Sequence, residues 1–252
     1  MKTEQRQYEK GSWTIESDNQ LGDSANLVMV FGSREMIANT DLFNEIRSFY
    51  PNAHILSGTT AGEIQDDMVF DDTLVVTAAC FEKTEIEVAN MSINDAEDSQ
   101  QAGVELAKQL EGDGLCHVFL LSDGLNVNGS EIVKGINSEL KSEVACTGGL
   151  AGDAANFEKT LVGVDAPAEE HQIVALGFYG SNLTVGYGSI GGWDKFGTER
   201  LVTKSEGNVL YELDGQSALD LYKMYLGEKA KELPSSALLF PLGMKFDEDS
   251  DT

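Results

Sequence analysis

Residues 53–67 read AHILSGTTAGEIQDD, and residues 143–157 read EVACTGGLAGDAANF, a similar sequence. An offset of 90 places Ala61-Gly62-Glu63 on Ala151-Gly152-Asp153. In each copy an apolar run leads into a glycine-rich loop that ends in an acidic residue. Self-similarity at a fixed period indicates a repeated structural unit. We therefore predict that the chain contains an internal duplication.

The residues around the two loops complete two similar units. LVMVFGS (27–33) and HVFLLSDG (117–124) come before a helical segment, and LVVTAACF (74–81) and IVALGFYG (173–180) come after the loops. The same offset also matches Gly58 with Gly148 and Val28 with Val118. A strand, a helix and a second strand predict parallel pairing with a right-handed crossover, and the strands that follow can pair antiparallel. We predict an α/β fold of mixed β-sheets flanked by helices, built from two pseudo-repeated β-α-β-loop-β units.

Hydrophobic periodicity assigns the remaining elements. Short runs rich in branched residues predict strands at 27–31, 53–56, 74–81, 86–91, 118–121, 144–147, 173–179, 183–189 and 237–240, with a hairpin of 201–203 and 209–211. Apolar residues three and four positions apart predict helices at 39–50, 102–110 and 217–226, and a further helix with Ser130 as its N-cap.

The charge restricts the partners of the protein. The 252 residues include 43 acidic and 17 basic side chains, which gives a formal net charge of −26. Such a surface repels phosphate backbones and anionic lipids, so we expect no nucleic-acid partner and no membrane partner. Solubility or adaptation to high salt explains this acidic excess better than cation binding by clustered carboxylates does.

Cysteine usage and the N-terminus indicate a cytoplasmic protein. The three cysteines, Cys80, Cys116 and Cys146, lie in apolar runs and form no CxxC motif, as expected of buried thiols in a reducing compartment. The first 13 residues are polar, with no apolar core of a signal peptide. No apolar stretch approaches the roughly 18 residues that a membrane span needs.

Motifs along most of the chain resemble one family. SGTTAGEI (57–64), TGGLAGD (147–153), GGW (191–193), NVLYELDGQSALDLYKMYLG (208–227) and LLFPLGM (238–244) are similar, in this order, to the FIST domain family. The resemblance implies a bacterial or archaeal sensory module that binds amino acids or similar metabolites. It also implies a signalling partner such as a histidine kinase or a cyclic-dinucleotide enzyme. Some members of the family resemble haem proteins that sense nitric oxide.

The resemblance also divides the chain. We expect an N-terminal extension over 1–24, a ligand-sensing domain like the FIST N-terminal domain over 25–230, and the start of a C-terminal half, apparently truncated, over 231–252. Family members normally continue past the FPLG motif, and a site shared between the two halves would then be incomplete here. The resemblance implies no catalytic residues.

The two loops that end in an acidic residue are the first candidate site. Gly148 and Gly149 allow close approach of the backbone to a ligand, and the hydroxyls of Thr59 and Thr60 can donate to it. The carboxylates of Glu63 and Asp153 can hold an ammonium group. The alternative is structural: the glycines form tight turns and the acids cap helices.

Two strand ends and one aromatic residue add further candidates. Ser33 follows the first strand of one unit, and Ser122 and Asp123 follow the first strand of the other, at the carboxyl ends where α/β sheets bind ligands. The alternative is that they form ordinary turns between strand and helix. Trp193, beside Gly191 and Gly192, can form the wall of a pocket, or else cover a core.

Enzymatic and haem functions remain as alternatives. A small-molecule hydrolase would use Ser122 or Cys116, but Ser122 lacks the G-x-S-x-G context, and the neighbours Cys116 and His117 would point to opposite faces of a strand. The histidines His54, His117 and His171 have no spacing typical of a metal site, so we expect no metal. Any one of them could still be the single axial ligand of a haem.

We therefore expect a sensory domain without catalytic activity that binds an amino-acid-like metabolite between the two repeated units and signals to a partner protein. Thr60, Glu63, Gly149 and Asp153 should then lie near one cavity. No cofactor is expected, and the alternatives are a haem-based nitric oxide sensor and a small-molecule hydrolase.

Overall fold

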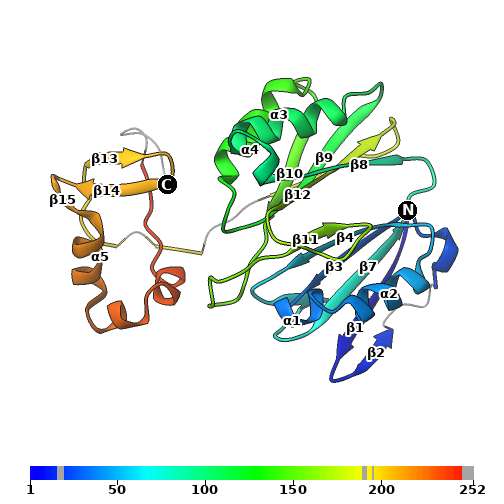
Figure 1. Cartoon of the computed structure of the whole chain (residues 1–252), viewed down its shortest axis with the longest axis horizontal. Helices are drawn as coiled ribbons and strands as arrows, with labels where there is room; N and C mark the ends of the chain where they lie inside the picture. The colour runs from blue at the N-terminus through cyan, green and yellow to red at the C-terminus, as the bar shows by residue number, and fades with distance from the viewer. Residues whose placement is uncertain (16–19, 189–191, 195, 246–252) are drawn as a thin grey trace. The chain divides into compact units, whose positions relative to one another are not determined.

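The structure is a computed structural model that describes residues 1–15, 20–188, 192–194 and 196–245 (Figure 1). The chain forms two compact units, Met1–Tyr187 (unit 1) and Gly188–Thr252 (unit 2). The predicted mixed sheets with flanking helices are confirmed.

Unit 1 contains a six-stranded sheet in the order β11-β4-β3-β7-β1-β2. Its strands are β1 (Lys2–Glu9), β2 (Ser12–Ile15), β3 (Leu27–Gly32), β4 (His54–Thr59), β7 (Leu74–Cys80) and β11 (Val162–Val164). Strands β3 and β4 pair in parallel, with Leu27 opposite His54, and β7 pairs antiparallel with β3 and with β1. The sheet therefore includes β1, a segment that the sequence assigns to an N-terminal extension.

A second sheet of unit 1 has four strands in the order β10-β9-β12-β8. They are β8 (Glu85–Ser92), β9 (Leu115–Ser122), β10 (Ala145–Leu150) and β12 (Gln172–Tyr179). Strands β9 and β10 are parallel, whereas β12 is antiparallel to both β9 and β8. A separate hairpin is formed by β5 (Glu63–Gln65) and β6 (Met68–Phe70).

Three hydrophobic cores arrange unit 1 in four layers. The first core joins the six-stranded sheet to α1 (Arg34–Ile37) and α2 (Thr40–Phe49), through Ile37 and Ile46. The second joins the four-stranded sheet to α3 (Ser99–Gln109) and α4 (Gly129–Glu139), which lie together above it in Figure 1. The third lies between the two sheets and includes Leu56 of β4 and Leu121 of β9. The order is therefore helices, sheet, sheet, helices.

The two sheets share one pattern of strands. In each, a parallel pair is followed by an antiparallel strand and then by another antiparallel strand: β4-β3-β7-β1 in one sheet and β10-β9-β12-β8 in the other. The internal duplication itself stays a prediction. Strand β11, which follows β10 in sequence, pairs with β4 of the other sheet, so it ties the two sheets together at one edge.

Three local predictions are wrong. The N-cap of α4 is Asn128 and not Ser130, because the Asn128 side chain accepts hydrogen bonds from the backbone N–H groups of Ser130 and Glu131. Residues 237–240 form no strand; the short 3-10 helix η4 (Ser235–Leu238) begins just before them. Residues 183–188 form no strand either, and position 189 lies outside the described residues.

Unit 2 contains a small sheet and a helix. The sheet has the order β13 (Val202–Glu206), β14 (Val209–Leu213) and β15 (Gln216–Ser217), and helix α5 (Ala218–Leu226) follows. The predicted hairpin is confirmed, with its turn at Gly207-Asn208. Ser217 caps α5 by accepting from the N–H of Asp220. The other 3-10 helices of the described residues are η1 (Gly22–Ser24) and η2 (Ile93–Asp95) in unit 1, and η3 (Gly227–Glu232) in unit 2.

An ionic cluster holds the end of β11 against β4. The Asp165 carboxylate contacts Nδ1 of His54 and Nη2 of Arg47, both at 2.7 Å. Burial alone would raise the pKa of Asp165, but hydrogen bonds from His54, the Ile55 N–H and Arg47 outweigh it and lower the pKa to about 2. The hydrogen bond with Asp165 raises the pKa of His54 in spite of partial burial.

This cluster predicts a pH dependence of stability. Because the pKa of His54 is raised on folding, its contribution is complete below about pH 6.5 and is lost as the pH rises through the pKa of the folded state. The contribution of Asp165 is present above about pH 4 and is lost as the pH falls towards 2. We expect His54→Gln to lower the free energy of unfolding by roughly 0.5 kcal/mol near pH 5.5, since both side chains are partly exposed, and by less near pH 8.5. Urea unfolding at the two pH values measures this, and an effect that grows with pH would contradict it.

Candidate functional site

The loops after β4 and β10 meet at one edge of unit 1. The N–H of Gly152 donates to the carbonyl of Thr59 over 2.9 Å, and the N–H of Ala151 donates to the carbonyl of Ser122 over 2.8 Å. The N–H of Thr60 donates to the carbonyl of Gly32 at the end of β3. The carboxyl ends of β3, β4, β9 and β10 therefore converge, and they bring most of the candidate residues predicted from the sequence together.

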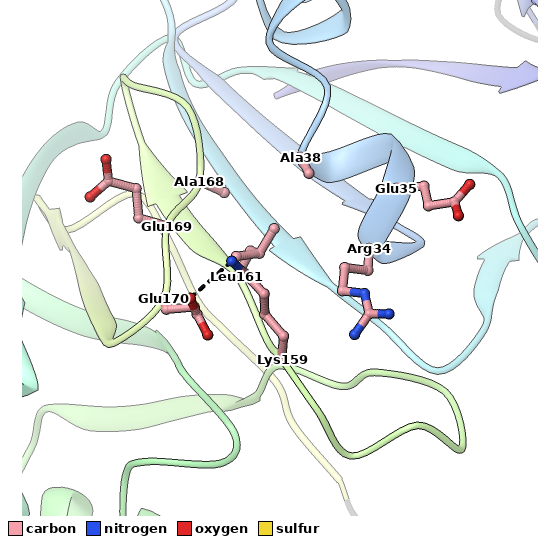
Figure 2. A pocket seen from close by; sticks show the side chains of 8 residues that line it. All are labelled: Arg34, Glu35, Ala38, Lys159, Leu161, Ala168, Glu169 and Glu170. Atoms are coloured by element: carbon pink, nitrogen blue, oxygen red, sulfur yellow. Dashed lines mark ion pairs between the residues drawn. The ribbon is translucent and has the colours of Figure 1, made fainter.

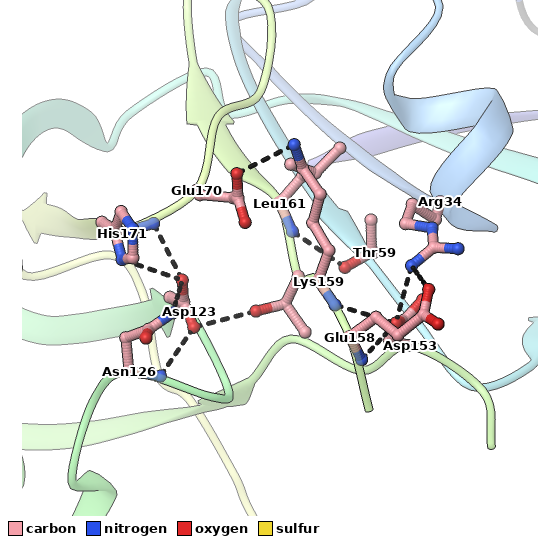
Figure 3. Close-up of polar contacts among 11 residues, drawn as sticks. Arg34, Thr59, Asp123, Asn126, Asp153, Glu158, Lys159, Leu161, Glu170 and His171 are labelled. Carbon is pink, nitrogen blue, oxygen red and sulfur yellow. Dashed lines mark hydrogen bonds and ion pairs between the residues drawn. The ribbon is translucent and has the colours of Figure 1, made fainter. Parts of the chain in front are cut away.

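Residues 158–161 form a segment, here called the returning segment, that is hydrogen-bonded to the candidate residue Thr59 (Figure 3). The Thr59 hydroxyl accepts from the N–H of Leu161 at 3.1 Å, and the Thr59 N–H donates to the Leu161 carbonyl. Thr59 is 1% exposed. Its polar groups therefore hold the segment against β4.

Asp123 is completely buried, and five hydrogen bonds converge on it. Its carboxylate accepts from the N–H groups of Leu125, Asn126 and His171, from the Asn126 amide and from the Thr160 hydroxyl, at 2.7 to 3.0 Å. Burial works to raise the pKa of Asp123, but the hydrogen bonds from Asn126, Leu125 and His171 outweigh it and hold the pKa below its usual range. The carboxylate therefore joins three segments of unit 1.

Glu63 is also bonded within the protein. The Thr60 hydroxyl donates to one of its carboxylate oxygens at 2.7 Å, and the N–H and hydroxyl of Thr73 donate to the other at 3.1 and 3.0 Å. Its exposed fraction is 2%. These contacts fix the start of the β5–β6 hairpin beside β7.

Asp153 connects the second loop to Arg34. Nη1 of Arg34 lies 3.1 Å from Asp153 and 3.1 Å from Glu158, and Oδ2 of Asp153 also accepts from the N–H groups of Glu158 and Lys159. Arg34 begins α1 directly after Ser33. The predicted acceptor of an ammonium group thus already holds a guanidinium group.

An open depression of about 710 Å³ lies beside this ion pair (Figure 2). One side is formed by α1 and Ala38, and the other by the returning segment and the loop before β12. Nζ of Lys159 lies 2.9 Å from the Glu170 carboxylate. The lining residues are Arg34, Glu35, Ala38, Lys159, Leu161, Ala168, Glu169 and Glu170.

None of the ten predicted site residues lines the depression. Its lining comes from α1 in the first half of unit 1 and from residues 159–170 in the second half. Two of the predicted residues lie close to the lining residue Arg34. Ser33 precedes it in the sequence, and the Asp153 carboxylate forms an ion pair with it. The sequence offered one signal for Arg34 and Lys159: they are two of only 17 basic residues, and each lies close to a predicted candidate.

The remaining candidates lie in different surroundings. Ser122 is buried, with its hydroxyl bonded to the carbonyl of Asp123. Gly148 lies against the carbonyl of Leu120, whereas no atom would lie within 4 Å of a Cβ at Gly149. Trp193 belongs to unit 2 and is exposed.

The histidines and cysteines form no obvious reactive centre. Sγ of Cys116 donates to the Phe178 carbonyl, while Nε2 of His117 lies 2.8 Å from the Thr147 hydroxyl, so they have different partners. Burial lowers the pKa of His117 and raises the pKa of Cys146 to about 11. No group of three His, Cys, Asp or Glu among the described residues could hold a metal ion.

The three histidines lie in different surroundings. His54 is bonded to Asp165, His117 is buried against Thr147, and His171 lies 3.9 Å from Asp123. No histidine lines the depression. The haem alternative stays a prediction, and absorbance spectra of protein produced with added haem would test it.

Comparison with known proteins gives a family match. The model of the FIST N domain matches residues 26–216, about three quarters of the chain. None of the curated proteins compared with the sequence matches it. Within the described part of the chain, no helix is both long enough and apolar enough to cross a membrane.

Proposed function

The chain belongs to the FIST N domain family, a family of sensory domains, and from this membership we propose that it senses an amino-acid-like metabolite in the depression beside Arg34. The observation that carries the proposal is the arrangement of charges there. Two cationic and three anionic side chains surround a small apolar surface of Leu161, Ala38 and Ala168. A zwitterion with a modest side chain fits this chemistry, and 710 Å³ lies within the usual volume range of small-molecule sites.

Arg34 is the expected contact for a carboxylate. Both of its ion pairs use Nη1, and within the described residues Nε and Nη2 make no hydrogen bond. A guanidinium edge with free, parallel N–H groups binds a carboxylate with two hydrogen bonds. Asp153, whose side chain is 3% exposed, holds Arg34 in place from the interior. The proposed role of Asp153 is therefore to position Arg34, and not to contact the ligand itself.

The acidic residues on the other side would receive the ammonium group. Glu169 and Glu170 come just before β12, and Glu170 is paired with Lys159. A ligand that pairs with Glu170 would release Lys159, so the lysine could contact the ligand carboxylate as well. Binding would thus exchange ion pairs between α1 and the loop before β12.

We propose that this exchange produces the signal. A ligand shifts a conformational equilibrium only by as much as its affinities for the two states differ. Contacts made at once with α1 and with 159–170 favour the state in which these segments are close. The proposed receiver is a signalling protein such as a histidine kinase or a cyclic-dinucleotide enzyme. The buried, internally bonded state of Ser122 supports a role without catalysis.

Replacement of Arg34 tests the proposal directly. We expect titration calorimetry with a panel of amino acids to find a ligand, and Arg34→Ala to weaken its binding roughly 10- to 100-fold, because a hydrogen-bonded charge pair is lost. Lys159→Ala should weaken it less, by about 3- to 10-fold.

The matched control is Arg200→Ala in unit 2, which removes an arginine with the same 3.1 Å contact to a carboxylate, that of Asp214. It should leave ligand binding unchanged. Thermal melting without ligand shows whether Arg34→Ala is folded. If the wild-type protein binds no zwitterion of the panel, or if Arg34→Ala and Arg200→Ala behave alike, the proposal is wrong.

A further inference from the structure

Unit 2 exposes an unusual share of its apolar side chains. On the sheet, Val202, Val209 and Tyr211 are 43 to 46% exposed, and on α5 Leu219, Met224 and Tyr225 are 53 to 68% exposed. Among its described residues, the only buried side chains are those of Ala218, Leu221 and Ser236. So small a core gives little stability to a unit of this size. The apolar faces therefore indicate an interaction surface.

Unit 2 carries a smaller net charge than unit 1. Residues 1–187 contain 31 acidic and 10 basic side chains, a net charge of −21. Residues 188–252 contain 12 acidic and 7 basic side chains, a net charge of −5. Two copies of the chain therefore repel each other less through unit 2 than through unit 1.

Strand β13 is an open edge with a self-complementary sequence. It pairs with β14 on one side and with no strand of the described residues on the other. A free edge of this kind can add a strand from another chain. If β13 pairs antiparallel with β13 of a second copy about a twofold axis at Ser205, Lys204 lies opposite Glu206 at two symmetric places. Opposite charges at facing positions stabilise such pairs.

We propose that unit 2 is a self-association module, in which β13 of two copies pairs antiparallel through Ser205 to form one continuous six-stranded sheet. The pairing would also extend the apolar face that carries Val202, Val209 and Tyr211 across the twofold axis. This contact is independent of the ligand site, because every residue of that site lies in unit 1. Two sensory units would then be joined in one dimer.

Charge exchange at the edge tests the pairing. We expect sedimentation velocity of the full chain to show a monomer–dimer equilibrium that is stronger at high salt, because unit 1 repulsion is screened. Lys204→Glu alone and Glu206→Lys alone should each weaken the dimer by about tenfold, since both symmetric pairs become repulsive. The double exchange of Lys204→Glu with Glu206→Lys should restore the wild-type dimer to within about threefold.

The control is Lys223→Glu, the same charge reversal on the exposed side of α5, which should leave the dimer intact. Thermal melting of each variant separates loss of pairing from loss of folding. A protein that stays monomeric at all concentrations overturns the proposal, as does a dimer that the single exchanges do not weaken or that the double exchange does not restore. Slow hydrogen exchange of the β13 amides in a monomer would mean that something other than a second copy covers this edge, and would also overturn it.

Discussion

Replacing Gly148 with alanine is expected to destabilise the protein by at least about 3 kcal/mol, the largest effect of any single methyl group at the candidate site. Gly148 lies in β10 with φ of 153°, and an added Cβ would lie 1.8 Å from the carbonyl oxygen of Leu120 in the neighbouring strand. Backbone atoms cannot move aside without breaking the pairing of β9 and β10. Urea unfolding followed by tryptophan fluorescence measures the loss.

Gly149→Ala is the matched control in the same strand. No atom lies within 4 Å of a Cβ at this position, so the change in stability should stay within about 0.5 kcal/mol. The folded Gly149→Ala protein can then be titrated with ligand. Unchanged binding would remove Gly149 from the candidate site, while equal destabilisation by both substitutions would contradict the explanation given for Gly148.

Asp123→Asn is expected to destabilise the protein by about 3–5 kcal/mol near neutral pH. Three donors meet one carboxylate oxygen and two meet the other, so the amide nitrogen of asparagine would face at least two donors. Buried N–H groups of the loop after β9 would lose their acceptor. The turn at 123–126 and the connection to Thr160 and His171 would loosen together.

The pH dependence identifies the cause of this loss. Because the pKa of Asp123 is lowered on folding, its contribution is present above about pH 4 and is lost as the pH falls through the pKa of the folded state. The difference in unfolding free energy between wild type and Asp123→Asn should therefore shrink at acid pH. Asp113→Asn, an exposed position, serves as control and should change stability by less than about 0.5 kcal/mol. A difference that stays constant down to about pH 2 would contradict the role of the charged carboxylate.

Elements with a strong local pattern could be predicted from the sequence. Strands β3, β7 and β12 are apolar runs of six to eight residues, and α2 and α3 carry apolar residues at helical spacing, so their patterns are visible without tertiary information. Strand β1 has neither pattern, because most of its side chains are polar, including Glu4, Arg6 and Gln7. It is a strand because β7 offers it a free edge. The apolar run 237–240 fits a strand and a helix equally well, and the prediction chose the wrong one.

The candidate site, too, could be predicted from the sequence only in part. The repeat of two loops that end in an acidic residue is a sequence property, but the meeting of these loops is not, because β4 and β10 belong to different sheets. The sequence could not show that Glu63 and Asp123 are buried and accept several hydrogen bonds from protein groups, or that Arg34 reaches Asp153, 119 residues away. Such contacts depend on the packing of the two sheets.

The family, the mixed α/β class, the acidic charge and the presence of the two loops follow from local pattern or composition, so the sequence is sufficient to predict them. Which polar groups face the interior and which face the depression depends on the tertiary structure. The reason is that a carboxylate has the same chemistry wherever it stands, whereas its burial and its donors are set by segments that are distant in sequence. The same holds for Gly148 and Gly149, which are adjacent and identical, but only one of them is pressed against a neighbouring strand.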